Sequence, residues 1–233
     1  MKKLNLLAID VSSQNLSLCI IRKDKIVVDI NRKVRFGASL LISYIDKSLK
    51  KASLDLKGID AFVLGSGPGS FTGLRVSYSV VKAFAVALNK PVIALGSFFS
   101  CAYPFKNKEE KIAVVSDARR NLIYLGCFKI LRLKAQDGEG GKVLKKEGKE
   151  KLINFEELTD KKGYLFVTYD SHIREQALNS NLGINFYPKD VHPKARYFFP
   201  LAKEYYSKGK FTSIDKLKPL YLHPKTCQVK KQR

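Results

Sequence analysis

A glycine-rich segment between two apolar runs limits what this chain can fold into. Residues 65–75, Gly-Ser-Gly-Pro-Gly-Ser-Phe-Thr-Gly-Leu-Arg, follow an apolar run at 61–64 and precede a helical pattern at 74–88. Glycines allow positive φ and close backbone approach, and the first turn of a helix leaves N–H groups unpaired. The order strand, glycine turn, helix therefore predicts an α/β protein, with the turn where many such proteins bind an anion.

The segment lacks the residues of a standard phosphate-binding loop. No Lys stands directly before Ser or Thr as in a P-loop, and the glycine spacing differs from GxGxxG. The segment thus marks a place in the fold without specifying a reaction, and the sequence offers no catalytic residue.

Charge is the second feature that constrains function. The chain has 43 Lys and Arg against 21 Asp and Glu, a formal net charge of +22. A field of this sign attracts polyanions, most often nucleic acid. The basic residues are spread along the chain, and aromatic residues do not alternate with Arg in an RNA-binding motif. Two interpretations stay open: a surface that contacts RNA, and a general enrichment in Lys.

Composition also bears on location and redox state. Asn5 and Asp10 interrupt the N-terminal apolar run, and no run approaches the roughly 20 residues that span a bilayer. We therefore expect a cytoplasmic protein with no membrane partner. The cysteines lie far apart with no CxxC pair, which favours buried, reduced thiols over a disulfide scaffold or a zinc site.

The order of the expected elements repeats once along the chain. The first series has three strands, a helix, a strand, the glycine turn, a helix and a strand, at residues 4–10, 16–21, 25–31, 38–51, 59–64, 65–75, 74–88 and 91–95. The second has two strands, a strand, a helix, a short strand and a helix, at residues 112–116, 122–133, 164–168, 171–178, 184–187 and 195–207.

Two such series predict two lobes of related design. This is the α/β architecture of the actin, sugar-kinase and Hsp70 ATPase group, a ribonuclease H-like fold with nucleotide between the lobes. We place the N-terminal lobe at residues 1–100, the C-terminal lobe at 101–217, and an extended segment with a basic tail at 218–233. Residues 134–151 are rich in Gly, Lys and Glu, which predicts a solvated excursion.

Four segments resemble the TsaB (YeaZ) family. Residues 7–13, Leu-Ala-Ile-Asp-Val-Ser-Ser, resemble its opening strand, and residues 67–75 resemble its central signature almost residue for residue. Asp-Ala-Arg at 117–119 and Pro-Leu-Tyr-Leu at 219–222 are similar to two further motifs of the family, in its order and spacing. One departure stands at 36–39, where Phe-Gly-Ala-Ser replaces the family's usual His-Ser segment.

The resemblance implies a non-catalytic subunit that pairs with a TsaD-type catalytic subunit. Together with a TsaE-type ATPase, this pair supports threonylcarbamoyl transfer to adenosine beside the anticodon of ANN-decoding tRNAs. The resemblance implies that ATP and a metal belong to the complex and that this chain alone binds neither. It allows tRNA contact through the basic surface. The oligomeric state of the isolated chain stays open, with a homodimer as one way to cover the same helical surface.

The histidines argue against a metal site in this chain. TsaD holds its metal with a His-x-x-x-His pair, whereas His172, His192 and His223 are never four residues apart. They therefore lack the shared helix face that such a pair needs. We expect all three on the surface or in loops, with no metallopeptidase motif.

The turn after the first strand argues against nucleotide hydrolysis by the chain alone. The turn after Asp10 carries the side chains of Ser12 and Ser13, where active members of the actin-like group have glycine so that the backbone can approach phosphate. We interpret Asp10 as orienting this turn and Asp117 as stabilising a hairpin. The alternative interpretation is that these four residues are vestiges of a nucleotide site.

The glycine segment then has a structural interpretation. Ser70 or Thr72 can cap the following helix, and Gly73 permits close packing. Arg75 opposes the helix dipole, so we expect an acidic or phosphate partner for it. The signature loop and helix cap comprise Gly67, Pro68, Gly69, Ser70, Thr72, Gly73 and Arg75.

The helix after this loop is apolar on most sides, so it is either enclosed by its own lobe or shared with a second protein. We expect it to pack against a partner together with the helix at 38–51. The predicted contact residues are Leu41, Ile45, Ser77, Val80, Val81 and Phe84.

Two further hypotheses stay open. One is an autonomous ATP-dependent kinase or hydrolase of the actin-like fold. The other is a free-standing basic RNA-binding protein, which the charge alone motivates.

Overall fold

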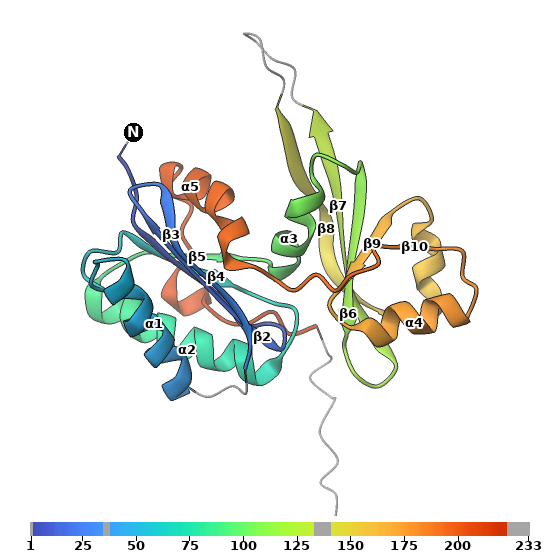
Figure 1. The fold of residues 1–233 in the computed structure, drawn as a ribbon, viewed down its shortest axis with the longest axis horizontal. Helices are drawn as coiled ribbons and strands as arrows, with labels where there is room; N and C mark the ends of the chain where they lie inside the picture. The colour runs from blue at the N-terminus through green and yellow to red at the C-terminus, as the bar shows by residue number, and fades with distance from the viewer. Residues whose placement is uncertain (1, 35–37, 133–140, 223–233) are drawn as a thin grey trace, which may run out of the picture.

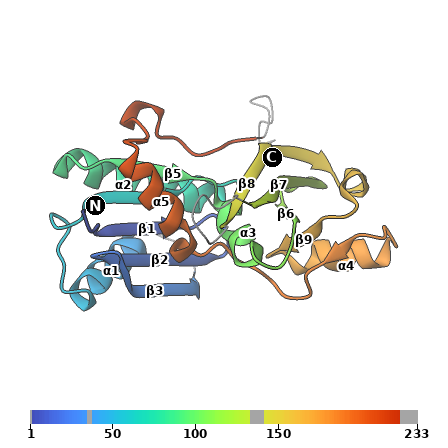
Figure 2. The same cartoon turned by 90° about the horizontal axis from the view of Figure 1, so that it is seen from above.

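A computed structural model describes residues 2–34, 38–132 and 141–222, which form two lobes side by side (Figures 1 and 2). The first lobe is built on a five-stranded sheet with the order β3-β2-β1-β4-β5. Strands β1, β2 and β3 pair antiparallel, and β1, β4 and β5 pair parallel. The strands are β1 Leu6–Asp10, β2 Asn15–Arg22, β3 Lys25–Lys33, β4 Ala61–Gly65 and β5 Val92–Leu95.

The second lobe repeats this topology. Its sheet has the order β10-β9-β6-β7-β8, so that β6, β7 and β8 take the places of β1, β2 and β3. The strands are β6 Lys111–Asp117, β7 Leu122–Arg132, β8 Lys142–Asn154, β9 Leu165–Thr168 and β10 Asn185–Phe186. The duplicated sheet is the two-lobed actin-like fold that the sequence predicts.

Helices cover both faces of the first sheet. Helices α1 (Ala38–Lys51) and α2 (Phe71–Leu88) pack side by side on one face, and α5 (Phe199–Ser207) lies on the other (Figure 1). The remaining helical elements are α3 Ser97–Ala102, η1 Tyr103–Phe105, η2 Glu156–Lys161, α4 Ser171–Asn179, η3 Ala195–Phe198 and η4 Ile214–Lys216. Elements η2 and α4 cover one face of the second sheet.

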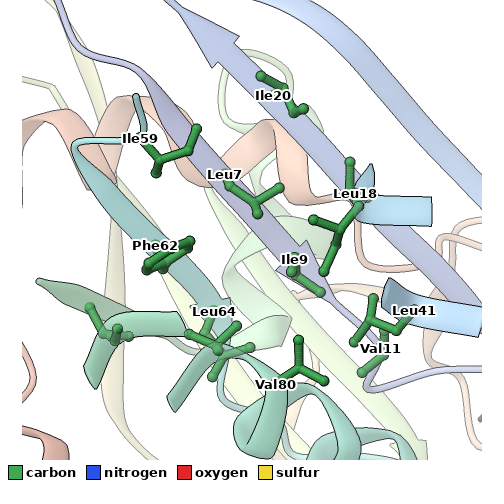
Figure 3. Packing of buried hydrophobic residues seen from close by; sticks show 14 of the residues in the cluster. Leu7, Ile9, Val11, Leu18, Ile20, Leu41, Ile59, Phe62, Leu64 and Val80 are labelled. Atoms are coloured by element: carbon green, nitrogen blue, oxygen red, sulfur yellow. The ribbon is translucent and has the colours of Figure 1, made fainter. Parts of the chain in front are cut away.

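Burial on both faces explains why β1 is apolar without alternation. Leu7 and Ile9 point into the core beneath α1 and α2, which Figure 3 shows, whereas Leu6 and Ala8 point into the core beneath η3 and α5. A strand covered on both sides needs apolar residues at every position. The sequence pattern of residues 6–9 therefore follows from the layered arrangement.

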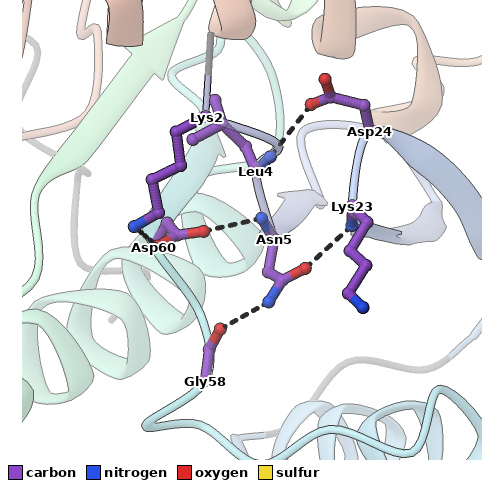
Figure 4. Close-up of polar contacts among 7 residues, drawn as sticks. All are labelled: Lys2, Leu4, Asn5, Lys23, Asp24, Gly58 and Asp60. Carbon is purple, nitrogen blue, oxygen red and sulfur yellow. Dashed lines mark hydrogen bonds and ion pairs between the residues drawn. The ribbon is translucent and has the colours of Figure 1, made fainter.

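Polar contacts fix the beginning of β1 (Figure 4). The carboxylate of Asp60 accepts hydrogen bonds from the Asn5 N–H at 2.8 Å and from Lys2 Nζ at 2.7 Å. The Asn5 side chain donates to the Gly58 carbonyl at 3.0 Å and accepts from the Lys23 N–H at 2.8 Å. One asparagine thus joins β1 to the β2–β3 turn and to the segment before β4.

The C-terminal part of the chain corrects the expected lobe boundary. Residues 195–207 were expected in the second lobe, but Ala195, Phe198 and Ala202 are fully buried against the first sheet. The Thr212 N–H donates to the Val92 carbonyl at 2.8 Å, which ties the following segment to β5. The second sheet in turn begins at Lys111. The apolar area beneath η3 and α5 decides this placement, and order along the chain could not show it.

The structure also corrects the expectation for the polar residues 134–151. Residues 134–151 were expected to form a solvated excursion, yet residues 142–151 belong to the 13-residue strand β8, which pairs with β7. A backbone hydrogen-bond ladder does not require apolar side chains, and Lys is common on edge strands because it discourages further pairing. Residues 134–140 lie outside the described part of the chain, as do the tail at 223–233 and residues 36 and 37 of the segment that departs from the family pattern.

Helix α2 is the described helix that is long and apolar enough, by length and composition alone, to cross a bilayer. Leu74, Ser77 and Val81 on this helix are buried within the first lobe. Its apolar character therefore has an explanation in the core, and no membrane span is inferred.

Removing the Phe198 side chain tests the placement of the C-terminal segment. Phe198→Ala should lower the free energy of unfolding by about 3–5 kcal/mol, because it leaves a cavity under the first sheet. Phe211→Ala is the control, since that ring is 44% exposed, and it should cost about 1 kcal/mol or less. Urea unfolding of both variants gives the comparison, and equal losses would contradict the packing described.

Candidate functional site

The glycine-rich segment at residues 65–75, which we call the glycine loop, packs against the turn that follows β1. The Ser70 N–H donates to the Ser12 carbonyl at 2.6 Å, and Ser70 Oγ accepts from the Gly73 N–H at 3.3 Å. Ser70 is therefore the N-cap of α2, as one of the two candidates predicted, whereas Thr72 lies exposed within the first turn. The cap also fixes where α2 begins.

Two glycines are required by this contact. A Cβ on Gly69 would stand 2.1 Å from the Ser12 carbonyl oxygen, and Gly69 has a φ of +150°. A Cβ on Gly73 would stand 2.2 Å from the Val11 carbonyl oxygen. The loop and the first turn of α2 thus approach the β1–β2 turn more closely than any side chain allows, and the predicted packing role of Gly73 is confirmed.

The other side of the loop is joined to α3. The Gly67 N–H donates to Ser97 Oγ at 3.0 Å, and the Gly67 carbonyl accepts from the Ser97 N–H at 2.9 Å. Gly67 has a φ of +88°, which favours glycine, and Pro68 after it is buried. The loop is therefore fixed between β1 and the connection to the second lobe.

No described acidic residue pairs with Arg75, for which an acidic or phosphate partner was expected. Its guanidinium lies 4.4 Å from the centre of the Phe71 ring, one turn earlier on α2, and no ion pair joins it to a described residue. The ring face attracts the cation and offsets the unfavourable helix dipole.

Asp10 orients the turn after β1, as predicted. Its Oδ1 accepts from the Ser12 N–H at 2.9 Å and from Ser12 Oγ at 2.7 Å, and the residue is 1% exposed. Burial raises the pKa of this carboxyl, while the hydrogen bonds from Ser12 and the nearby Ser97 hydroxyl act in the opposite direction. Its Oδ2 has no hydrogen-bond partner among the described residues and lies where a Cβ on Gly65 would be.

The same turn is filled by side chains. Ser12 and Ser13 are buried, and Ser13 Oγ accepts from the Asn15 N–H at 3.1 Å. A phosphate that approached this backbone would have to displace them. The geometry supports a structural role for Asp10, Ser12 and Ser13.

Asp117 occupies the matching place in the second lobe. Its Oδ1 accepts from the Arg119 N–H at 2.7 Å, which stabilises the β6–β7 hairpin as predicted. Its own N–H donates at 2.8 Å to the carboxylate of Asp170, whose pKa is raised by burial. Sequence reasoning missed Asp170. The repeated topology could have found it, because it follows β9 as the glycine loop follows β4.

These turns surround a cleft of about 790 Å³ between the lobes. The extended segment near the C-terminus borders it: the Leu220 N–H donates to the Ser66 carbonyl at 3.0 Å, and the Tyr221 ring lies 5.4 Å from that of Phe71. The cleft is lined by residues 12–14, 69–72, 117–120, 124, 169, 170 and 220–222. The structure thus brings together residues from all four motifs that carried the family resemblance.

The described residues contain no group of three His, Cys, Asp or Glu that could hold a metal ion. His172 lies exposed on α4, 3.8 Å from Asp117. His192 lies in a loop, but it is half-buried and stacks on the Tyr169 ring, and burial lowers its pKa. His223 falls outside the described residues.

The cysteines in the described part of the chain match the expectation of buried, reduced thiols. Cys19, Cys101 and Cys127 are buried and free, and burial raises the pKa of each. Cys227 lies outside the described residues.

The predicted partner contacts lie on the wrong side of their helices. Five of the six residues are at most 8% exposed and belong to the core of the first lobe: Leu41, Ile45, Ser77, Val80 and Val81. Phe84 is half-buried against the same core. The most apolar stripe of α1 and of α2 packs against the sheet beneath them. Sequence periodicity alone could not show whether this stripe contacts the sheet or a partner protein.

A different face of these helices is exposed. Val86 is 62% exposed on α2 and Ile42 is 48% exposed on α1. Ser79, Ala83 and Val86 follow one another at helical spacing on the exposed side of α2. We call Ile42, Ser79, Ala83 and Val86 the outer helix face.

Comparison with known proteins places the chain in a family. The sequence model of the TsaD family, described as tRNA N6-adenosine threonylcarbamoyltransferase, matches residues 37–181. The tRNA threonylcarbamoyladenosine biosynthesis protein TsaB of Haemophilus influenzae is 28% identical over 142 residues. The chain belongs to the TsaB (YeaZ) branch of the TsaD family. The TsaB protein of Escherichia coli is 22% identical over 223 residues.

Coverage differs between these relatives of the TsaB family. The match spans 60% of this chain and 60% of the Haemophilus influenzae protein, but 94% of this chain and 94% of the Escherichia coli protein. The solved structure of YeaZ from Pseudomonas aeruginosa has a TM-score of 0.75 with 23% identity, covering 93% of this chain and 100% of that one. The TsaB fold therefore extends over nearly the whole chain.

Gly73→Ala tests the close contact at the glycine loop. At an ordinary position inside a helix this substitution stabilises by about 1 kcal/mol. Here the added Cβ meets the Val11 carbonyl, so we expect a loss of about 2 kcal/mol or more. Ser79→Ala, at an exposed position on the same helix, should change stability by less than about 0.5 kcal/mol. Thermal unfolding distinguishes the two, and a stabilising Gly73→Ala would contradict the contact.

Asp10→Asn tests the buried carboxyl through pH. Because the folded-state pKa is raised, the folded chain holds its proton more tightly than the unfolded chain. The stability of the unmodified protein should therefore fall, relative to Asp10→Asn, as pH rises from about 3.8 through the folded-state pKa of Asp10, and then level off. Urea unfolding of both proteins across this range gives the difference curve. A flat curve, or one that rises with pH, would contradict the assignment.

Proposed function

We propose that this chain is a non-catalytic subunit that pairs with a TsaD-type catalytic subunit and supports threonylcarbamoyladenosine formation in tRNA. The names of the relatives give the pathway, since TsaB proteins are described as tRNA threonylcarbamoyladenosine biosynthesis proteins. The division of labour is argued from the geometry of the cleft and of the helices.

The observation that carries the proposal is the filled turn after β1. Asp10 accepts its hydrogen bonds from Ser12, and the buried Ser12 and Ser13 side chains occupy the place where phosphate would meet backbone N–H groups. The glycine loop, which lies next to this turn, contacts the Ser12 carbonyl at Gly69. Neither turn is free to surround a phosphate in the way an actin-like ATPase requires.

The acids of the second lobe are similarly engaged. Asp117 accepts from the Arg119 N–H and Asp170 accepts from the Asp117 N–H, so both carboxylates hold backbone in place. A carboxylate that fixes a hairpin is poorly placed to orient a metal or an attacking water. This supports a subunit that acts through a partner.

The outer helix face is the surface we assign to that partner. Ile42 and Val86 are large apolar side chains left in solvent, and the small residues Ser79 and Ala83 permit a partner helix to approach closely. Helices α1 and α2 lie side by side, and no other described element covers them on this side (Figure 1). A partner with two similar helices would complete a four-helix contact.

Val86→Glu tests the pairing. A carboxylate placed in the middle of an apolar contact is desolvated without a partner, so the affinity for the TsaD-type subunit should fall at least about tenfold. Val27→Glu is the matched control, because Val27 is 41% exposed on β3, and it should leave the affinity unchanged. Co-purification and calorimetry give the comparison.

Two results would overturn the proposal. One is failure of the unmodified chain to associate with a TsaD-type protein, with or without ATP. The other is ATP turnover by the purified chain alone that is lost in Asp10→Asn. That result would favour an autonomous actin-like ATPase, for which the cleft of about 790 Å³ is the supporting observation.

A further inference from the structure

A cluster of lysines gathers on the second lobe, away from the cleft and from the outer helix face. Lys111 on β6 lies directly opposite Lys129 on β7, and Lys129 lies directly opposite Lys145 on β8. Directly opposed side chains point to the same face of a sheet, and neighbouring strands are about 4.8 Å apart. Three cations therefore stand in one row across three strands.

A hollow of about 190 Å³ adjoins this row and adds three more cations. It is lined by Leu125, Cys127, Glu147, Lys149, Lys151, Lys161 and Tyr164. Lys111 and Lys161 both lie over the Tyr164 ring, at 5.6 Å and 5.9 Å from its centre. The row and the hollow are thus one surface, and we call its six lysines, 111, 129, 145, 149, 151 and 161, the lysine cluster.

One acidic side chain lines the hollow of the lysine cluster. Glu147 is the acidic residue that lines the hollow; it accepts a hydrogen bond from the Tyr164 hydroxyl at 2.6 Å and lies 3.8 Å from Lys129. Like charges directly opposite one another destabilise a sheet. The lysine row therefore costs folding free energy unless an anion offsets the repulsion.

Protection of the sheet edge does not account for the whole cluster. Lysines on an edge strand discourage aggregation, which explains Lys145, Lys149 and Lys151 on β8. Lys111 and Lys129 lie on inner strands, and Lys161 lies at the end of η2. Four separate elements converge on one surface, which points to a ligand.

We propose that the lysine cluster binds the sugar-phosphate backbone of a folded RNA. Ammonium groups attract phosphates without reading bases. Tyr164 is not free to stack on a base, because its hydroxyl is bound to Glu147 and its ring lies beneath two lysines. The surface therefore favours the backbone of a structured RNA over an unpaired strand. This inference adds an RNA-binding surface to the proposed function, whose substrate is a tRNA. It rests on the proposed function only for the identity of the RNA.

The test compares two triple variants of the full chain, with no other subunit present. The cluster variant carries Lys145→Gln, Lys149→Gln and Lys151→Gln, all exposed on β8. The control carries Lys25→Gln, Lys57→Gln and Lys216→Gln, which are exposed on the first lobe. Each variant lowers the formal net charge of +22 by three, so any effect of net charge alone is the same in both. Circular dichroism and thermal unfolding establish that both are folded.

Binding of an unmodified tRNA transcript is measured by fluorescence anisotropy from 50 to 200 mM salt. The cluster variant should lose about tenfold or more in affinity, and the slope of log affinity against log salt should fall in magnitude by about 2 to 3. The control variant should keep its affinity within about twofold and its slope within about 1.

Three outcomes would overturn the proposal: equal losses in both variants, which would assign binding to net charge; no tRNA binding by the unmodified chain; or tighter, cluster-dependent binding to phosphatidylserine vesicles than to tRNA. Association with the TsaD-type subunit is measured separately, on the outer helix face. The two proposals can therefore fail independently.

Discussion

The contact between the glycine loop and the β1–β2 turn is the constraint on which the first lobe depends. The Ser70 N–H reaches the Ser12 carbonyl, and Gly69 and Gly73 lie so close to the same turn that a Cβ at either position would collide with its backbone. This contact fixes the start of α2, and α2 covers the first sheet. One close approach therefore supports the core and sets the direction of the exposed helix face.

Duplication of topology explains the rest of the architecture. The second sheet repeats the strand order of the first, and Asp117 and Asp170 brace its turns as Asp10 and Ser12 brace those of the first lobe. The two sets of turns face each other across the cleft. The surfaces that we assign to partners lie elsewhere, on the outer helix face of α1 and α2 and on the lysine cluster of the second lobe.

Much of the fold was predictable because it depends on local chemistry. The strand at residues 6–10, the N-cap at Ser70 and the hairpin at Asp117 each follow from residue types at short range. The partner contacts were not predictable in this way. Leu41, Ser77 and Val81 are apolar or small and lie on helices, but only the position of the sheet determines that they point inward.

The sequence by itself determined the family, the two-lobed α/β class and the role of the glycine loop, because each rests on neighbouring residues whose backbone demands are local. Only the tertiary structure decided which helix face is exposed, that residues 195–207 complete the first lobe, and that lysines from four elements meet on one surface. These facts depend on pairs of residues far apart along the chain. Burial of apolar area and strand register bring such pairs together, and neither is a property of a single segment.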